Sequence, residues 1–270
     1  MPELPDVELF KRLVEQHCMG CVIAKAVVAD PGSLDGSSPT ALQERLKGER
    51  LRSCRRHGKV LFIEVASAGA LAMHFGTNGS LAYLVRDQQE PPYVRLWLDF
   101  ADGDRLAYVN PRRIGHVQLV QSSDAFIAGA GLGPDALDPS FDAAAFAAAL
   151  GERKQAIKSI LMDQTRMAGI GNIYADEILF QAKLHPATSA NALDTSATRR
   201  LFEAVKSVLQ TAIDCGAGAE NFTDRLPKGF LIPERHAGGR CPRCGTALQA
   251  DKRGGRTGYF CPDCQPEPRA

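Results

Sequence analysis

The apolar positions between residues 21 and 120 come in short runs separated by Gly, Pro, Asn and Asp. Short runs bounded by turn residues are typical of β-strands joined by tight loops. The pattern predicts strands at Cys21–Val28, Arg50–Cys54, Val60–Val65, Leu71–His74, Ser80–Val85, Val94–Phe100, Arg105–Val109 and His116–Val120. A series of short strands of this kind favours a β-sandwich or a barrel.

Helical spacing of apolar residues flanks this β-rich region. Val7, Phe10, Leu13 and Val14 recur at helical intervals and predict a helix over Asp6–His17. After about residue 138 the chain becomes rich in Ala and its period becomes helical. The other predicted helices are Thr40–Lys47, inserted among the strands, and then Phe141–Leu150, Lys154–Asp163, Ile173–Gln181 and Ala197–Ile213.

These elements predict an α+β multidomain protein. We expect a β-sandwich with flanking helices over residues 1–121, a linker over 122–137, a helical domain over 138–230 and a C-terminal β-hairpin finger over 231–270. A chain of 270 residues with 44% hydrophobic content is sufficient for two domains with their own cores.

The strongest chemical signal is a set of four cysteines near the C-terminus, arranged as two Cys-x-x-Cys pairs with sixteen residues between them. Each pair can form a tight knuckle, and the intervening stretch is long enough for one hairpin that brings the knuckles together. We predict one structural zinc ion bound by Cys241, Cys244, Cys261 and Cys264. Basic residues near the hairpin tip leave two interpretations open, a purely structural clip and a contact with nucleic acid.

Composition narrows the classes of function. No apolar run approaches membrane-spanning length, and the acidic, proline-interrupted N-terminus does not resemble a signal peptide. We therefore expect a cytoplasmic protein, nucleoid-associated if the source is bacterial, with reduced thiols that suit zinc better than disulfides. The net charge of +1 means that any surface for nucleic acid must be local.

A glycine-containing turn between two predicted helices is a candidate phosphate clamp. Gly169 and Gly171 can bring backbone amides close to an anion, with Lys158 on the preceding helix and Asn172 entering the next one. A simple helix connector also fits this turn.

Further basic residues form two clusters, and each cluster taken alone is typical of a solvated face. The clusters are Arg52, Arg55, Arg56 and Lys59, and then Arg112 and Arg113. Several such clusters beside a zinc hairpin indicate a DNA-binding groove.

Six motifs occur in an order that resembles one known family. They are Pro2–Glu8, Lys59–Leu61, His74–Gly79, Asn110–Gly115, Gly169–Glu177 and the four cysteines. Together they are similar to the formamidopyrimidine-DNA glycosylase/endonuclease VIII family of base-excision repair enzymes, and the likeness extends from residue 2 to residue 264. The resemblance implies a β-sandwich, a helix–two-turns–helix domain and a zinc finger. It also implies a monomeric bifunctional DNA glycosylase/AP lyase that binds damaged double-stranded DNA and needs no nucleotide cofactor.

The N-terminal residues can carry this chemistry. Removal of Met1 would leave Pro2 with a secondary amine, and a terminal amine is less basic than lysine and partly neutral near pH 7. Attack at the sugar C1′ would displace the damaged base and form an iminium, which promotes β-elimination and then δ-elimination. Glu3 lies beside this amine and can transfer protons. A structural proline and a helix N-terminal carboxylate are the alternatives.

The resemblance assigns roles residue by residue. Pro2 corresponds to the Schiff-base nucleophile, Glu3 to the acid/base, and Lys59 to a lysine that contacts phosphate and assists β-elimination. Arg256 corresponds to the finger arginine, which contacts phosphates flanking the lesion and assists δ-elimination. The remaining DNA-contact residues are Lys158 and Asn172, with Arg153 or Lys154 as a further contact, and His74, which is interpreted as architectural rather than as a base.

Departures from the family pattern concern the substrate. The family fills the space left by an extruded nucleotide with a Met, Arg and Phe trio, and here those positions are Thr77, Arg112 and Ile114. Thr77 is too short to replace Met, so Arg112 is the expected principal filler. The family's N-terminal Glu is Asp6, and residues 221–240 are shorter than the loop that caps 8-oxoguanine. The preferred lesion therefore stays open among 8-oxoguanine, formamidopyrimidines, oxidised pyrimidines, hydantoins and abasic sites.

Two other functions are alternatives to a glycosylase/AP lyase. One is a lesion- or abasic-site-binding protein with weak or no excision, and the other is a zinc-ribbon DNA-binding regulator.

Overall fold

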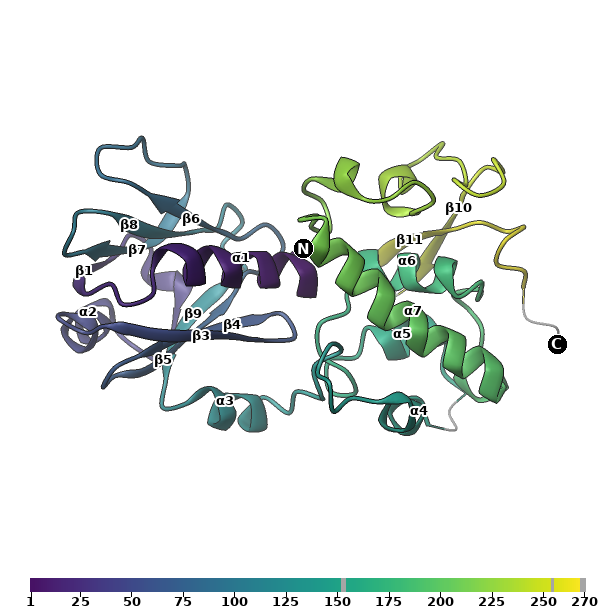
Figure 1. Cartoon of the computed structure of the whole chain (residues 1–270), viewed down its shortest axis with the longest axis horizontal. Helices are drawn as coiled ribbons and strands as arrows, with labels where there is room; N and C mark the ends of the chain where they lie inside the picture. Colours follow the sequence, from purple (N-terminus) through teal and green to yellow (C-terminus); the bar gives the residue numbers. More distant parts are fainter. Residues whose placement is uncertain (152–153, 254, 268–270) are drawn as a thin grey trace. The chain divides into compact units, whose positions relative to one another are not determined.

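The computed structural model describes residues 1–151, 154–253 and 255–267. The chain forms two compact units (Figure 1). The first contains Met1–Pro2 and Asp6–Gly131, and the second contains Glu3–Pro5 and Leu132–Ala270. No helix in the described ranges is both long and apolar enough to cross a membrane.

The first unit is a sandwich of two sheets, as the spacing of apolar runs predicted. One sheet has the strand order β1-β7-β8-β6 and the other has the order β2-β9-β5-β4-β3. All neighbours pair antiparallel except β2 and β9, which pair in parallel. The bounds are β1 Ile23–Val28, β2 Leu34–Asp35, β3 Leu51–His57, β4 Val60–Val65, β5 Gly69–His74, β6 Ser80–Leu84, β7 Val94–Phe100, β8 Arg105–Val109 and β9 His116–Val120.

Alternating apolar residues from both sheets fill the interior of the sandwich. Leu61 and Ile63 of β4 share this core with Leu96 and Leu98 of β7. Strand β4 is also buried on its outer face, where the ring of Phe62 packs edge-on against Phe126 at a centroid distance of 5.5 Å.

Three helices cover the sandwich. Helix α1 (Leu4–His17) lies along the two edge strands β3 and β6, because Glu8 bonds Arg56 of β3 at 3.0 Å and His17 stacks on Tyr83 of β6 at 4.6 Å (Figure 1). Helix α2 (Pro39–Leu46) packs on β1, and α3 (Ser123–Gly129), which supplies Phe126, covers β4.

The second unit is built around helix α6 (Asn172–Gln181), in which every residue from Ile173 to Phe180 is buried. Helix α7 (Thr195–Asp214) packs against it with an apolar face that includes Leu201, Val205 and Leu209. Helices α4 (Ala143–Leu150) and α5 (Ile157–Leu161) complete the helical part.

The four-cysteine finger closes the second unit. Its hairpin consists of β10 (Gln249–Arg253) and β11 (Arg256–Phe260), and β11 packs against α6. In the rest of the finger, the Arg243 guanidinium lies 4.3 Å from the centroid of the Phe180 ring, and Gln265 Nε2 donates to the carbonyl of Leu184 at 2.8 Å.

Candidate functional site

Glu3 is buried, with 1% of its surface exposed, at the start of α6. Its carboxylate accepts N–H bonds from Gly171 at 2.7 Å, Ile173 at 2.9 Å and Tyr174 at 3.2 Å. The first turn of a helix leaves such N–H groups without intrahelical partners, and a carboxylate is a favourable ligand for them. The anion at this turn is therefore the side chain of Glu3, whereas the sequence predicted a DNA phosphate there.

Gly169 allows the N-terminal segment to lie on the same turn. The N–H of Leu4 donates to the Gly169 carbonyl at 3.0 Å, and Gly169 has a φ of +118°. A Cβ at this position would lie 2.5 Å from Leu4 Cδ1, so a larger residue would displace the segment. Pro2, which is half-buried, directly precedes this anchored segment.

Lys158 does not occupy the surface position that a phosphate contact requires. Only 3% of its side chain is exposed, and Nζ bonds Asp176 Oδ1 at 2.6 Å. The prediction of a direct phosphate contact by Lys158 is corrected on this point, because burial and the ion pair hold its ammonium group inside the protein. The spacing of the sequence could not identify Asp176 as its partner.

Asp176 lies within a cluster of polar groups beneath β11. Its Oδ2 accepts from Arg235 Nε at 2.7 Å and from the N–H of Tyr259 at 2.9 Å. The carbonyl of Thr257 accepts from Arg235 Nη2 at 2.9 Å and from Asn172 Nδ2 at 2.8 Å. Asn172 thus uses one N–H of its amide to hold the finger strand.

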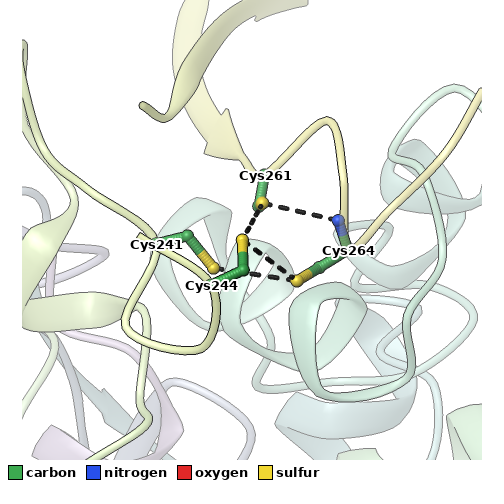
Figure 2. Close-up of side chains that lie close together, drawn as sticks. All are labelled: Cys241, Cys244, Cys261 and Cys264. Atoms are coloured by element: carbon green, nitrogen blue, oxygen red, sulfur yellow. Dashed lines mark hydrogen bonds between the residues drawn. The ribbon is translucent and has the colours of Figure 1, made fainter. Parts of the chain in front are cut away.

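The four predicted zinc ligands converge on one point (Figure 2). Their sulfur atoms all lie within 4.8 Å of one another, with Sγ–Sγ separations of 3.8 Å for Cys241–Cys264 and 3.5 Å for Cys244–Cys261. Tetrahedral zinc with Zn–S bonds of about 2.3 Å requires sulfur atoms about 3.8 Å apart. The residues fit a structural zinc ion, which supplies a crosslink between the two knuckles and has no open position for substrate.

Arg256 begins β11 and its side chain is exposed. Its backbone pairs with Arg253 across the hairpin, and Gly255 precedes it with a φ of +73°. The basic hairpin predicted from the sequence is therefore present, with Arg256 beside its tip.

In the first unit, Lys59 lies at the tip of the β3–β4 hairpin. His57 pairs with Val60, so Gly58 and Lys59 form a two-residue turn. Gly58 has a φ of +56°, which suits the first central position of a hairpin turn of this length. The same end of the sheet contains the end of β5 and the start of β9, because Val60 pairs with His74 and His74 pairs with His116.

His74 is a neutral imidazole held in one orientation. Burial, followed by the nearby charges of His116 and Lys59, lowers its pKa to about 4. Its Nδ1 accepts the N–H of Gly76 at 3.3 Å, so the neutral ring carries its hydrogen on Nε2. The His116 ring stacks on it at a centroid distance of 5.2 Å.

The loops 74–79 and 110–115 lie directly against each other at this end of the sandwich. A Cβ on Gly76 would lie 2.5 Å from the backbone nitrogen of Gly115, and a Cβ on Gly115 would lie 2.2 Å from Asn110 Nδ2. Asn110 is fully buried, and its Nδ2 donates to a carbonyl of the first loop at 3.3 Å. The two glycines and the buried amide bring together the residues predicted to fill the space of an extruded nucleotide, which are Thr77, Arg112 and Ile114 and are called the wedge residues below.

The three wedge positions differ in exposure. Thr77 is half-buried, Arg112 is exposed, and Ile114 has 56% of its surface exposed, which is high for a large apolar residue. Arg113, between the last two, has a φ of +55° and bonds Asp30 at 3.0 Å. Arg153, the remaining predicted DNA contact, lies outside the described residues.

The sequence did not predict the buried polar contacts around α6, which hold the finger strand and the segment before it. Asp176 and Arg235 were not singled out, and the partners of Glu177 could not be identified. Glu177 is fully buried and accepts from Gln181 Nε2 at 2.7 Å and from the N–H of Ile232 at 2.9 Å. The sequence did contain one signal for these contacts, which is the pair of acidic residues Asp176 and Glu177 among the apolar residues of this helix. Buried carboxylates require polar partners, so the pair indicates that such partners exist.

Three family models match successive parts of the chain. The formamidopyrimidine-DNA glycosylase N-terminal domain matches residues 1–117, the formamidopyrimidine-DNA glycosylase H2TH domain matches residues 132–224, and the zinc finger found in FPG and IleRS matches residues 238–266. A β-sandwich, a helix–two-turns–helix domain and a four-cysteine finger in this order define a class of DNA-repair glycosylases.

Whole-chain comparisons agree. The chain is 34% identical to a formamidopyrimidine-DNA glycosylase from Heliobacterium modesticaldum, over 98% of this chain and 100% of that protein. It is similar to the Lactococcus lactis enzyme bound to DNA with an AP site, at 29% identity, and to a mutant of that enzyme with Fapy-dG DNA, at 30%. Both structures have a TM-score of 0.87 and cover 98% of this chain and all of theirs. The chain belongs to the formamidopyrimidine-DNA glycosylase family, whose members are DNA glycosylases with AP lyase activity.

Proposed function

We propose that this chain removes oxidatively damaged bases from duplex DNA through a Schiff base at Pro2 and then cleaves the abasic strand by β- and δ-elimination. The observation that carries the proposal is the anchoring of Glu3. Three backbone amides at the start of α6, including that of the preceding Gly171, bind the Glu3 carboxylate, and Glu3 directly follows the proposed nucleophile in the chain. A proton-transfer group fixed beside an amine is the arrangement that this reaction needs.

The reaction proceeds by a balanced series of bond changes. After removal of Met1, the nitrogen of Pro2 attacks C1′ and loses its proton, and the bond from C1′ to the base breaks with its electron pair leaving on the base, which gains a proton. The C1′–O4′ bond of the sugar then breaks, O4′ takes a proton, and C1′ and the Pro2 nitrogen form an iminium. This iminium has no hydrogen on nitrogen, so it stays cationic and acidifies the C2′ proton. Loss of that proton breaks the C3′–O bond and releases the 3′ phosphate. Loss of a C4′ proton then breaks the C5′–O bond and releases the 5′ phosphate, and water frees the amine. Glu3 transfers protons during sugar opening.

Residues of both units provide the contacts with DNA in this proposal. Lys59, half-buried at a hairpin tip, and Arg256, exposed at the start of β11, contact phosphates. The neutral His74 contributes a fixed Nε2 donor, and Asn172 has a second amide N–H. Lys158 acts through Asp176 instead of contacting DNA directly.

Arg112 and Ile114 replace the extruded nucleotide in this proposal. Both are exposed on the loop 110–115, and apolar or planar side chains of this kind can enter the space between base pairs. Thr77 is half-buried beside them and contributes little volume. The relatives are named for formamidopyrimidine, and the two similar structures described above hold Fapy-dG or AP-site DNA, which makes formamidopyrimidine and abasic sites the first substrates to test. The paired thiols of the finger suit action in the cytoplasm.

A borohydride-trapping panel tests the proposal. Duplexes with formamidopyrimidine, 8-oxoguanine, an oxidised pyrimidine, a hydantoin or an abasic site are incubated with the protein and reductant, and covalent complexes are separated by denaturing electrophoresis. We expect trapping with one or more of these duplexes and weaker trapping by Pro2→Gly. Tight, salt-sensitive binding without trapping on any duplex would contradict the proposal and favour the lesion-binding alternative, which the altered wedge and short loop motivate.

A further inference from the structure

Asp176, Lys158 and Arg235 form a charged centre inside the second unit that none of the proposed chemical steps uses directly. Asp176 and Lys158 have 2% and 3% of their side chains exposed, and Arg235 has 13%. The carboxylate bonds Lys158 Nζ at 2.6 Å and Arg235 Nε at 2.7 Å. A buried carboxylate with two cationic partners is a costly arrangement to build, because each charge loses its hydration. A buried centre of this kind is expected to have a specific role at the place where it lies.

Strand β11 rests directly on the charged centre. A Cβ on Gly258 would lie 1.9 Å from Lys158 Nζ and 2.9 Å from Asp176 Oδ1, so only glycine allows this approach. On either side of Gly258 the centre bonds the backbone. Arg235 Nη2 donates to the Thr257 carbonyl at 2.9 Å, and the N–H of Tyr259 donates to Asp176 Oδ2 at 2.9 Å.

These bonds fix the strand at the residues that directly follow Arg256. The side chain of Arg256 is exposed and has many rotamers, so its reach depends on where its backbone is held. A displacement of about 1 Å in a positioned group can lower a rate by about 100-fold. The guanidinium of Arg235 bonds both the Asp176 carboxylate of α6 and the Thr257 carbonyl of β11, a two-pronged geometry that lysine cannot reproduce.

The finger has other attachments that do not involve this centre. The four cysteines hold its two knuckles, Arg243 stacks on Phe180, and Gln265 bonds the Leu184 carbonyl. Loss of Arg235 therefore leaves the finger attached and weakens the hold on the segment around Thr257, whose carbonyl keeps only the bond from Asn172 Nδ2. The charged centre therefore fixes the position of strand β11, whereas other contacts keep the finger folded and attached.

We propose that Arg235 is a positioning residue for the elimination steps, which acts by holding β11 through Asp176 and so placing Arg256 against the DNA phosphate. This inference rests on the role proposed above for Arg256. According to this proposal, the charged centre raises the fraction of β-elimination product that goes on to δ-elimination. It has no role in the attack by Pro2.

The test compares Arg235→Met, Arg256→Met and the double variant on a duplex with a preformed abasic site under single-turnover conditions. Arg199→Met, at an exposed arginine of α7, is the matched control. The readouts are the fraction of δ-elimination product, the rate of borohydride trapping and the zinc content. We expect Arg256→Met to lower the δ fraction about 10-fold and Arg235→Met about 3-fold or more, with trapping and zinc retained. The double variant should match Arg256→Met alone, because a residue that acts through Arg256 adds nothing once Arg256 is absent.

The outcomes separate this inference from the role of Arg256. An unchanged δ fraction in Arg256→Met contradicts both. An impaired Arg256→Met with a normal Arg235→Met contradicts only the positioning role, and so does a double variant whose losses multiply. If Arg235→Met loses zinc or unfolds, Arg235→Lys replaces it. That variant keeps the charge beside Asp176 but loses the two-pronged contact, and a δ fraction between those of wild type and Arg256→Met supports the inference. A wild-type fraction contradicts it.

Discussion

The predicted functional residues of the two units are held in opposite ways. At one end of the sandwich, Arg112 and Ile114 lie on a loop with their side chains exposed, and the half-buried Lys59 lies on a hairpin turn. Around α6, Glu3 and Asp176 are almost fully buried and each accepts at least three hydrogen bonds or ion pairs. Exposed cations act through charge and can be changed at little cost to folding, whereas buried carboxylates couple folding to the geometry of the site.

The largest effect is expected from Glu3→Gln. Glutamine cannot exchange a proton with the sugar, and its NH₂ group cannot accept from the amides of Gly171, Ile173 and Tyr174 as the carboxylate does. We expect base excision to fall at least about 100-fold in single-turnover assays, with DNA binding retained in gel-shift assays. Glu15→Gln, at a carboxylate of α1 with 43% of its side chain exposed, is the matched control. Unchanged excision by Glu3→Gln would remove the assignment of Glu3 as the acid/base.

A smaller effect, on stability, is expected from Glu177. Burial raises its pKa from 4.5 to about 7, against the opposing hydrogen bonds from Gln181 and Ile232. Between these values the unfolded chain loses the proton while the folded protein retains it, so this group's contribution to stability is complete below pH 4.5 and declines as pH rises to 7. The decline is on the order of 3 kcal/mol.

Glu177→Gln removes this dependence because glutamine does not titrate. Urea unfolding at pH 5 and pH 8 should show the variant gaining stability relative to wild type at the higher pH by on the order of 2 kcal/mol. Glu203→Gln, at an exposed carboxylate of α7, controls for the loss of a surface charge. A difference between variant and wild type that does not change with pH would show that Glu177 is ionised in the folded protein throughout this range.

The smallest effect is expected from Arg112→Met, which tests the exposed side of the comparison. Exposed side chains rarely change folding stability by more than about 0.5 kcal/mol, so the melting temperature should stay close to that of wild type. We expect affinity for an abasic duplex to fall less than about 10-fold and the slope of log K against log salt to decrease by about 1. An affinity and a salt slope equal to those of Arg199→Met would show that Arg112 does not contact the DNA.

The same contrast explains which features the sequence could predict. Alternating apolar runs predicted the paired strands of the sandwich, and the Cys-x-x-Cys pairs predicted the metal centre, because both signals are local. Strand β2 was missed because its two residues are extended only by pairing with β9. Helix α3 was missed although Ser122 caps it by accepting from the N–H of Ala125. Helix α5 is shorter than predicted because Ala156 instead pairs with Ser189.

The partners of the buried polar groups were beyond the reach of sequence reasoning. Glu3 bonds residues 168 to 171 positions away, and Asp176 bonds Arg235 at a separation of 59. Helical spacing placed Lys158 near the phosphate clamp but could not show that its charge would be used inside the protein. Residue types identified candidates for chemistry, and the tertiary structure decided which of them face solvent.

In the proposed function, the N-terminal amine performs the chemistry while the zinc finger positions a phosphate contact. Peptide mapping by mass spectrometry of the protein trapped with borohydride on an abasic duplex tests this division of roles. We expect the reduced sugar adduct on the nitrogen of Pro2, in an N-terminal peptide from which Met1 has been removed. An adduct on Lys59 or another lysine, with an unmodified N-terminal peptide, would contradict it.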